Sequence, residues 1–294
     1  MLFRSISKTI LNLLRYKTKR RKIIKNLLLN TLAASGLIYF SFQLLWGFNY
    51  QRLPLAKILK LDVHNSTSIE LEHLCKDLIT SSNTLRKKIN QNRNGVMELS
   101  YNKKIILETA HIGYENASFQ YIILKGTYGT PKGLLLSEPM CYTGITGFYF
   151  PFTSEANINM AEPDSYLPFT TCHEMAHQIG FAKEDEANYI AYVACINNPD
   201  INFKYSGTLA ALTYSLSSLR QYDPQKYKEL FAFCSKGVLN DMIYNENFWE
   251  GYSGRIEKIS EELNNTYLKS ASQRSGIKSY SAMVDFLLAN YRKK

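Results

Sequence analysis

The chain has 294 residues, of which 45% are hydrophobic and 20% are charged, and this composition excludes an intrinsically disordered protein. The formal net charge of +10 is in the range of nucleic-acid-binding proteins, but residues 1–25 contain nine lysines or arginines and no acidic side chain. Residues 26–294 therefore carry a net charge of only +1. Because that charge requires no basic face, we expect no nucleic-acid partner.

A long stretch without charged side chains follows the basic residues, from position 26 to position 51. Its most apolar part, at 27–46, has about the 20 residues that a helix needs to cross a lipid bilayer. Since a buried core helix would be shorter, we predict a basic cytoplasmic tail at 1–26, a transmembrane helix at 27–47 and one domain at 48–294. The positive-inside rule then predicts a single-pass membrane protein with a cytoplasmic N-terminus and an extracytoplasmic domain.

The domain after this segment is predicted to be mainly helical, with one region of short strands. Periodic apolar positions indicate helices over 67–92, 103–116, 208–222, 224–235, 247–270 and 279–291. Aromatic and β-branched runs separated by Gly and Pro indicate strands at 119–124, 133–136 and 144–153, with turns at 126–133 and 137–144. We therefore predict an α+β fold that is predominantly α and contains a small sheet.

The main chemical motif is HExxH, formed by His173, Glu174 and His177. Two histidines four positions apart lie on one face of a helix, so both imidazoles can reach a single ion. Zinc is the metal that this spacing suits. Glu174 projects beside the ion, where it can accept a proton from water. The same motif also occurs on solvated helices that bind no metal. The residues around it are therefore needed to distinguish a metal site from a solvated helix face.

The residues after the motif provide a candidate third ligand. Gly180 and Phe181 predict the end of the motif helix, and the acidic residues 184–186 are typical of the start of a second helix. Successive helical residues are about 100° apart, so Glu184 and Glu186 face nearly opposite ways. Glu184 begins a stripe of small or polar side chains that allows close packing on the motif helix. We therefore predict Glu184 as the third ligand and Glu186 as a partner of the helix dipole.

Two further side chains near the motif have predicted roles. Asn188 lies one turn beyond Glu184 and is placed to hydrogen-bond a ligand side chain. Cys172 precedes His173 but points about 100° away from the ligand face, so we do not expect it to bind metal. The five cysteines show no CxxC spacing, and we expect buried thiols rather than a cysteine metal site.

These motifs resemble two groups of proteins. The spacing of Glu184 and Asn188 is similar to the ExxxD or ExxxN element that supplies the third ligand in gluzincin metallopeptidases. Nearly the whole chain resembles a family of bacterial membrane proteins, domain of unknown function 3810. The matching segments are WGFNYQR at 46–52, GFYFPFTSEANIN at 147–159, HEMAHQIGFAKEDEANYIAY at 173–192 and the C-terminal YLK…SY.

The resemblance implies a zincin-like metallopeptidase domain with Zn²⁺ as cofactor. It also implies a bacterial inner-membrane location and a peptide or protein substrate in the cell envelope. Two features depart from known patterns. The loop between His177 and Glu184 is shorter than in most gluzincins, and the third histidine of a metzincin would fall on Lys183, a poor ligand.

The resemblance further suggests that GFYFPFT is a strand beside the motif helix, with Phe148, Tyr149 and Phe150 near a bound peptide. An ordinary strand packed on the core is the alternative, and Pro151 favours an edge or a strand end. Peptide hydrolysis also needs a donor for the oxyanion. The sequence leaves three candidates open for this role, namely Tyr252, Arg255 and Tyr214.

The features together predict a membrane-anchored zinc peptidase. His173, His177 and Glu184 would hold the ion, Glu174 would act as general base, and the lipid bilayer would be a permanent partner. The alternative is a non-enzymatic, membrane-tethered binding protein in which the zinc site is structural or vestigial.

Overall fold

The computed structural model describes residues 20–64, 67–270 and 282–293. The chain divides into two compact units, Met1–Phe48 and Asn49–Lys294. The described part of the first unit is formed mainly by helix α2 (Arg20–Leu45). Among the described residues, one helix is long and apolar enough to cross a membrane, over Arg21–Leu45. Most of the predicted basic tail lies outside the described residues.

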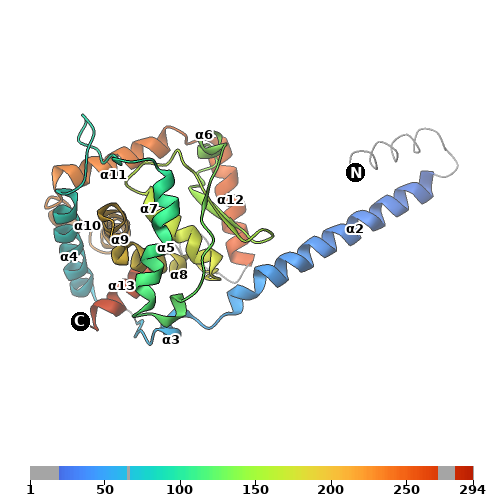
Figure 1. Ribbon diagram of the computed structural model, residues 1–294, viewed down its shortest axis with the longest axis horizontal. Helices are drawn as coiled ribbons and strands as arrows, with labels where there is room; N and C mark the ends of the chain where they lie inside the picture. The colour runs from blue at the N-terminus through green and yellow to red at the C-terminus, as the bar shows by residue number, and fades with distance from the viewer. Residues whose placement is uncertain (1–19, 65–66, 271–281, 294) are drawn as a thin grey trace. The chain divides into compact units, whose positions relative to one another are not determined.

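The second unit is mostly helical, as Figure 1 shows. After η2 (Gly47–Gln51) and α3 (Leu55–Ile58), the predicted helices at 67–92 and 103–116 are confirmed as α4 (Ser68–Arg86) and α5 (Lys104–Ser118). A capping box begins α4, because the Thr67 side chain accepts from the Glu70 N–H while the Glu70 carboxylate accepts from the Thr67 N–H. Such a cap satisfies backbone donors that would otherwise lack partners at the helix start.

The C-terminal half consists of helices that follow the predictions closely, with one correction. They are α9 (Ile201–Tyr222), α10 (Pro224–Phe231), α11 (Lys236–Glu250), α12 (Arg255–Ser270) and α13 (Met283–Tyr291). The prediction of one continuous helix over 247–270 is wrong, because the chain leaves helical geometry between Glu250 and Arg255, where two glycines lie. The start of the predicted segment 279–291 lies outside the described residues.

The sheet has three short strands in the order β1-β3-β2. They are β1 (Lys132–Gly133), β2 (Gly147–Phe150) and β3 (Glu155–Ile158), with β3 parallel to β1 and antiparallel to β2. The predicted strand at 144–153 is confirmed in its centre as β2, an outer strand that Pro151 follows directly. The central strand β3 was not predicted, since its alternate residues Glu155 and Asn157 are polar.

Two of the predicted strands are wrong. The run 119–124 ends in the short 3₁₀ helix η3 (Ile122–Leu124), and the run 133–136 contributes only Gly133 to β1. Leu135 is fully exposed, so its apolar character does not reflect burial in a sheet. The predicted turn at 137–144 contains a helix, α6 (Ser137–Cys141). Apolar composition alone therefore misled the prediction, because Leu135 and Leu136 are exposed rather than buried in a sheet.

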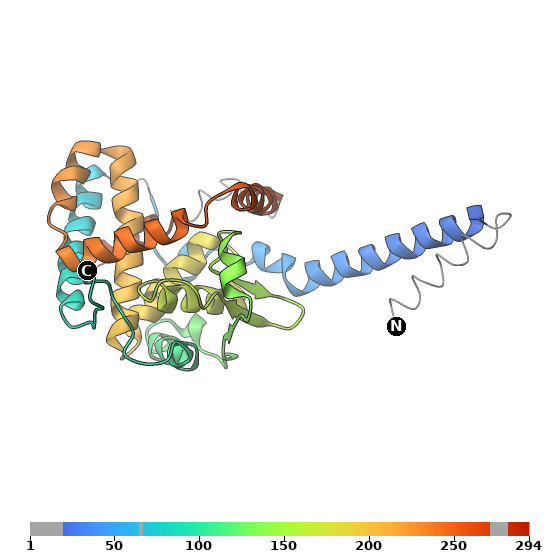
Figure 2. The same ribbon diagram turned by 90° about the horizontal axis from the view of Figure 1, so that it is seen from above.

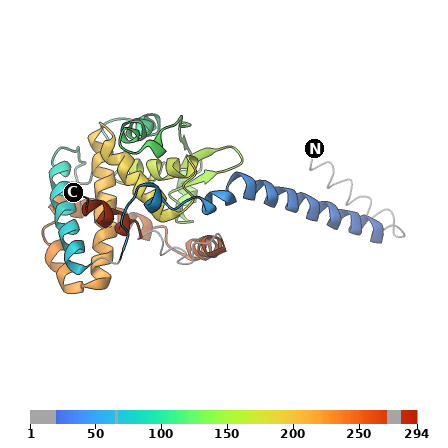
Figure 3. The ribbon, with the colours of Figure 1, turned by 90° about the horizontal axis from the view of Figure 1, so that it is seen from below.

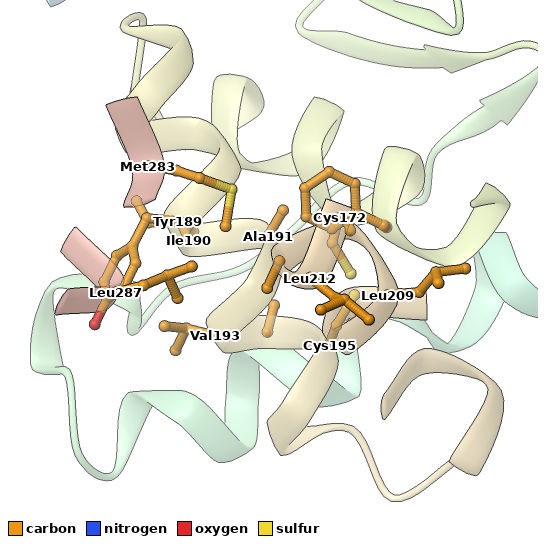
Figure 4. Close-up of a cluster of buried hydrophobic side chains, with 14 of the residues drawn as sticks. Cys172, Tyr189, Ile190, Ala191, Val193, Cys195, Leu209, Leu212, Met283 and Leu287 are labelled. Atoms are coloured by element: carbon orange, nitrogen blue, oxygen red, sulfur yellow. The ribbon is translucent and has the colours of Figure 1, made fainter. Parts of the chain in front are cut away.

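Helix α8 (Glu184–Asn197) lies at the centre of the core and packs against α5, α7 (Leu167–Gln178), α9 and α13. Figure 4 shows its side chains Ile190 and Val193 among apolar residues of neighbouring helices, with Cys172 and Cys195 in the same cluster. All five cysteines are buried and free, as predicted for small apolar roles. Figures 2 and 3 show α4 beside α9 at the border of this core.

A buried ion pair joins three of these helices. Asp241 of α11 accepts hydrogen bonds from Arg86 Nε at 2.6 Å and from the Tyr205 hydroxyl at 2.5 Å. Its second oxygen accepts from the Met97 N–H at 2.6 Å. Asp241 is fully buried and Arg86 is 4% exposed. Each charge offsets the cost of burying the other.

Candidate metal centre

The HExxH helix and the helix that follows it form a tight pair. Helix α7 ends at Gln178, and Gly180 takes the left-handed backbone conformation with φ of +90°. The Phe181 N–H then bonds back to the Ala176 carbonyl at 3.1 Å, which closes the helix end. After the connection Ile179–Lys183, helix α8 starts at Glu184 and packs along α7. The predicted helix end and the predicted second helix are both confirmed.

The structure brings His173, His177 and Glu184 together in one buried cluster. The oxygen Oε2 of Glu184 lies 3.2 Å from Nε2 of His173 and 3.5 Å from Nε2 of His177. The two imidazole rings are nearly perpendicular, with centroids 4.6 Å apart. One face of α7 thus presents both ring nitrogens to a single carboxylate oxygen from α8.

These distances suit a shared ion better than direct hydrogen bonds. Ligands about 2.1 Å from a tetrahedral zinc ion are themselves about 3.4 Å apart, close to the separations of 3.2 and 3.5 Å between Glu184 Oε2 and the two Nε2 atoms. Charge-assisted N–H···O bonds are shorter, at about 2.7–2.9 Å. Glu184 Oε2 is buried and makes no hydrogen bond of good geometry among the described residues. The donor set of two imidazoles and one carboxylate therefore fits zinc in type and spacing.

A backbone carbonyl orients one of the ligand rings. Nδ1 of His177 lies 2.7 Å from the carbonyl oxygen of Phe181. A carbonyl can only accept, so Nδ1 carries a proton, and Nε2 is the ring nitrogen that faces Glu184. This partner of His177 was not predicted, because a backbone carbonyl is provided by every residue type.

The electrostatics of the cluster favour binding of a cation. Burial alone would raise the pKa of the Glu184 carboxyl, but His177 and His173 outweigh burial and hold this pKa well below its usual range. For His177, burial opposes the charged ring, yet Glu184 raises the pKa of the imidazole to about 9. The carboxylate is thus charged, and a metal ion would take the place of the proton on His177.

Glu174, the predicted base, is buried beside the cluster. Its side chain is 4% exposed, and its oxygen Oε2 has no hydrogen-bond partner among the residues that the structure describes. Burial raises the pKa of this carboxyl, while the two histidines partly oppose the effect. Strand β2 lies directly against it, because a Cβ built on Gly147 would fall 2.8 Å from Glu174 Oε1. Gly147 was not predicted as a site residue.

Asn188 and Tyr214 form the next layer of polar groups. Asn188 is 2% exposed and hydrogen-bonds the hydroxyl of Tyr214. Burial raises the pKa of the Tyr214 hydroxyl, and nearby Tyr166 and Glu184 raise it further. The structure therefore places Asn188 on the same side of α8 as Glu184, with Tyr214 of α9 as its hydroxyl partner.

The remaining predicted residues lie on the sheet and on the C-terminal helices. Phe148 and Phe150 of β2 are 39% and 42% exposed, and the Tyr149 hydroxyl lies 3.4 Å from Ser154 Oγ. Tyr252 packs against the rings of Tyr142 and Phe248, and Arg255 is exposed at the start of α12. Of the oxyanion candidates, Tyr214 is thus the one with an electrostatic interaction with Glu184 among the described contacts.

Glu186 points away from the cluster, as predicted. Its Oε1 accepts a hydrogen bond from the Leu55 N–H at 2.9 Å and lies 3.7 Å from Lys183 Nζ. The carboxylate therefore links the start of α3 to the start of α8, a role that was not predicted beyond the helix dipole.

A second buried acid near Glu174 was also missed. Glu162 is 2% exposed, and its Oε1 accepts from the Thr170 hydroxyl at 2.9 Å. Burial raises the pKa of this carboxyl to about 8, and the charge of Glu174 contributes to the rise. Because Thr170 and Glu174 are one turn apart on α7, Glu162 lies beside the proposed base.

A mainly helical domain with a small sheet thus holds a buried His–His–Glu cluster between two adjacent helices. The chain belongs to the DUF3810 family, described as "Protein of unknown function (DUF3810)", whose family model matches residues 1–288. No curated protein and no solved structure matches the chain.

Proposed function

We propose that this protein is a membrane-anchored, zinc-dependent peptidase with a zincin-like domain. The observation that carries the proposal is the convergence of two imidazole nitrogens on one carboxylate oxygen at 3.2 and 3.5 Å, next to a second buried acid, Glu174. The HExxH spacing and the following acidic helix start are the matching features in the sequence. His173, His177 and Glu184 would hold the ion.

Zinc at this site would act as a Lewis acid that lowers the pKa of water to about 7 and polarises a peptide carbonyl. Glu174 then takes a proton from the attacking water and delivers it to the leaving amine. Burial supports this role, because it raises the proton affinity of the Glu174 carboxylate. Tyr214 is the best-supported donor to the oxyanion, since its hydroxyl lies near enough to Glu184 for the carboxylate to raise its pKa, and a hydroxyl that keeps its proton can donate.

The outer strand β2 supports an extended peptide as substrate. It borders the base at Gly147 and forms one edge of the sheet, where another strand can add its backbone hydrogen bonds. Phe148 and Phe150 project from it with large exposed areas, and apolar substrate side chains would cover them. The ligands themselves are only narrowly accessible, since the His173 and Glu184 side chains are each about 10% exposed.

The first unit supports membrane anchorage. Within Arg21–Leu45, the most apolar stretch of helix α2 has a mean hydropathy of 1.4, and none of this stretch is buried within the protein. About 37 Å of helix length exceeds the roughly 30 Å of a hydrocarbon core. The basic residues that precede the apolar part favour a cytoplasmic N-terminus, with the catalytic domain outside a bacterial inner membrane and substrates in the cell envelope.

The proposal is tested with the full-length protein in detergent. Metal content is measured first, and hydrolysis of a mixed fluorogenic peptide library is then followed with zinc and after chelation. We expect zinc-dependent cleavage by the wild type and none by Glu174→Gln, which removes the base but retains zinc. Equal cleavage by both proteins would exclude Glu174 as the base.

The burial of the three ligands favours one other candidate, a tethered binding protein with a structural zinc ion. Structural zinc sites have four protein ligands and no open position. A hydroxamate inhibitor distinguishes the two proposals, because it binds zinc only where a position is open. A rise in melting temperature with the inhibitor supports the peptidase, and bound zinc without that response supports the structural site.

A further inference from the structure

The segment at the start of the second unit packs onto the connection between the two metal-binding helices. Nη1 of Arg52 donates to the Ile179 carbonyl at 3.1 Å, at the C-terminal end of α7. The same guanidinium lies over the ring of Phe181, with Cζ 4.0 Å from the ring centroid. Arg52 thus binds two of the five residues that connect α7 to α8.

Neighbouring residues of this segment make further contacts around the connection. Asn49 Oδ1 and Arg52 Nη1 each lie 3.3 Å from the place that a Cβ on Gly180 would occupy. On the other side of the connection, the Leu55 N–H donates to Glu186 at 2.9 Å. The segment 49–55 therefore holds the connection from the end of α7 to the start of α8.

These contacts reach a metal ligand through one residue. Phe181, whose ring lies under Arg52, provides the carbonyl oxygen that accepts from His177 Nδ1 at 2.7 Å. The Phe181 side chain is 1% exposed, so the position of its ring and that of its carbonyl are not independent. A shift of the ring would move the acceptor that orients the imidazole.

We propose that Arg52 is a positioning residue of the metal centre. It holds Phe181, and the Phe181 carbonyl in turn holds the His177 ring with Nε2 toward Glu184. This inference rests on the proposed zinc site and deepens it. It assigns part of the support of the site to the segment that directly follows the predicted membrane helix.

The test compares full-length wild type with Arg52→Ala in detergent. The dissociation constant for zinc is measured by competition with a chromogenic chelator, at fixed pH. Loss of a partner that orients a ligand typically costs about 10- to 100-fold in metal affinity, and we expect about 10-fold for this more distant residue. Arg52→Lys should recover part of the loss, because lysine can reach the Ile179 carbonyl but cannot also stack flat on the ring.

Arg220→Ala is the matched control. Arg220 lies over the ring of Tyr227 with Cζ 5.7 Å from the centroid, on helices that contribute no ligand. Its removal deletes a contact of the same kind at a longer distance, and we expect unchanged zinc affinity. An equal loss in Arg52→Ala and Arg220→Ala would show a general effect on stability and would overturn the inference.

A second measurement separates this inference from the proposed function. The ¹⁵N signals of the histidine rings report which nitrogen carries the proton, with or without zinc. In metal-free protein we expect a sharp signal for the hydrogen-bonded Nδ1–H of His177 in wild type, and an exchanging or shifted Nδ1–H signal in Arg52→Ala. Identical ring spectra and identical zinc affinities would overturn the role of Arg52. Absence of zinc binding by wild type would overturn the proposed function. The ring spectra of metal-free protein would then still show whether Arg52 fixes the His177 ring.

Discussion

Gly147 of β2 and Glu174 of α7 touch so closely that no side chain fits between them. A Cβ on Gly147 would lie 2.7 Å from Glu174 Cγ and 3.0 Å from the carbonyl oxygen of Asn157. The carboxylate can move, but the Asn157 carbonyl belongs to the central strand and cannot. Glycine at this position therefore sets the distance between the strand and the proposed base.

We predict that Gly147→Ala lowers peptide turnover by about 100-fold, because a displacement near 1 Å of a catalytic group has an effect of that order. Zinc content should stay at the wild-type level, since no ligand is changed. Gly126→Ala is the control, because its Cβ would meet nothing within 4 Å. Steady-state kinetics with metal analysis measure both, and full activity in Gly147→Ala would show that the contact is dispensable.

Zinc should stabilise the folded protein through the cluster. At a free zinc concentration 100 times the dissociation constant, binding adds about 2.7 kcal/mol to the free energy of unfolding. His177→Ala and Glu184→Ala should lose this gain, whereas His111→Ala should keep it, because His111 lies 3.9 Å from Glu115 on α5 and provides no ligand. Thermal denaturation with and without zinc measures the gain. A zinc response that survives in Glu184→Ala would remove this residue from the ligand set.

Glu162 should make the metal-free protein less stable as the pH rises. Burial raises the pKa of its carboxyl to about 8 from an ordinary value of 4.5, so the folded state keeps a proton that the unfolded state releases. Stability is therefore highest below the unfolded pKa, falls between about pH 4.5 and 8 and then levels off. The loss is about 1.4 kcal/mol per pH unit in that window.

Glu162→Gln removes this ionisation and retains the acceptor for Thr170. We expect the variant to gain stability over wild type at pH 8 and to differ little at pH 4.5. Chemical denaturation in the presence of a chelator measures both at each pH. Parallel pH profiles for the two proteins would show that Glu162 does not titrate in this way.

Asp241→Asn should destabilise the fold strongly. The substitution leaves the buried Arg86 guanidinium without its counter-charge, and breaking a buried pair in this way costs about 3–5 kcal/mol. The exposed pair of Lys226 and Glu229 provides the comparison, since Lys226→Ala should change stability little. Equilibrium unfolding in urea compares the two variants. A small effect of Asp241→Asn would show that the buried Arg86 guanidinium does not need this counter-charge.

The parts of the site that are close in sequence were predictable. The spacing of His173 and His177, the glycine at 180 and the acidic start at Glu184 are local signals of helices and their ends, and the structure forms both helices where the signals lie. The choice of Glu184 over Glu186 followed from helical geometry together with the stripe of small or polar side chains that Glu184 begins. These predictions needed no knowledge of the rest of the fold.

The supporting contacts were not predictable in the same way. The Phe181 carbonyl is a backbone group that any residue would provide, and the approach of Gly147 to Glu174 depends on how the sheet packs on α7. The central strand β3 was not predicted because its alternate residues are polar, while the apolar run at 133–136, in which Leu135 and Leu136 are exposed, was wrongly predicted as a strand. Each of these features is set by tertiary packing rather than by local preference.

The short connection between α7 and α8 also bears on the order of folding. All three proposed ligands come from residues 173–184, so closing this loop around an ion costs little chain entropy. Arg52 reaches the same connection from far along the chain, and its contact forms only when distant parts of the chain meet. The proposed ligand set therefore depends only on local chain closure, whereas the docking of Arg52 is a separate, long-range step.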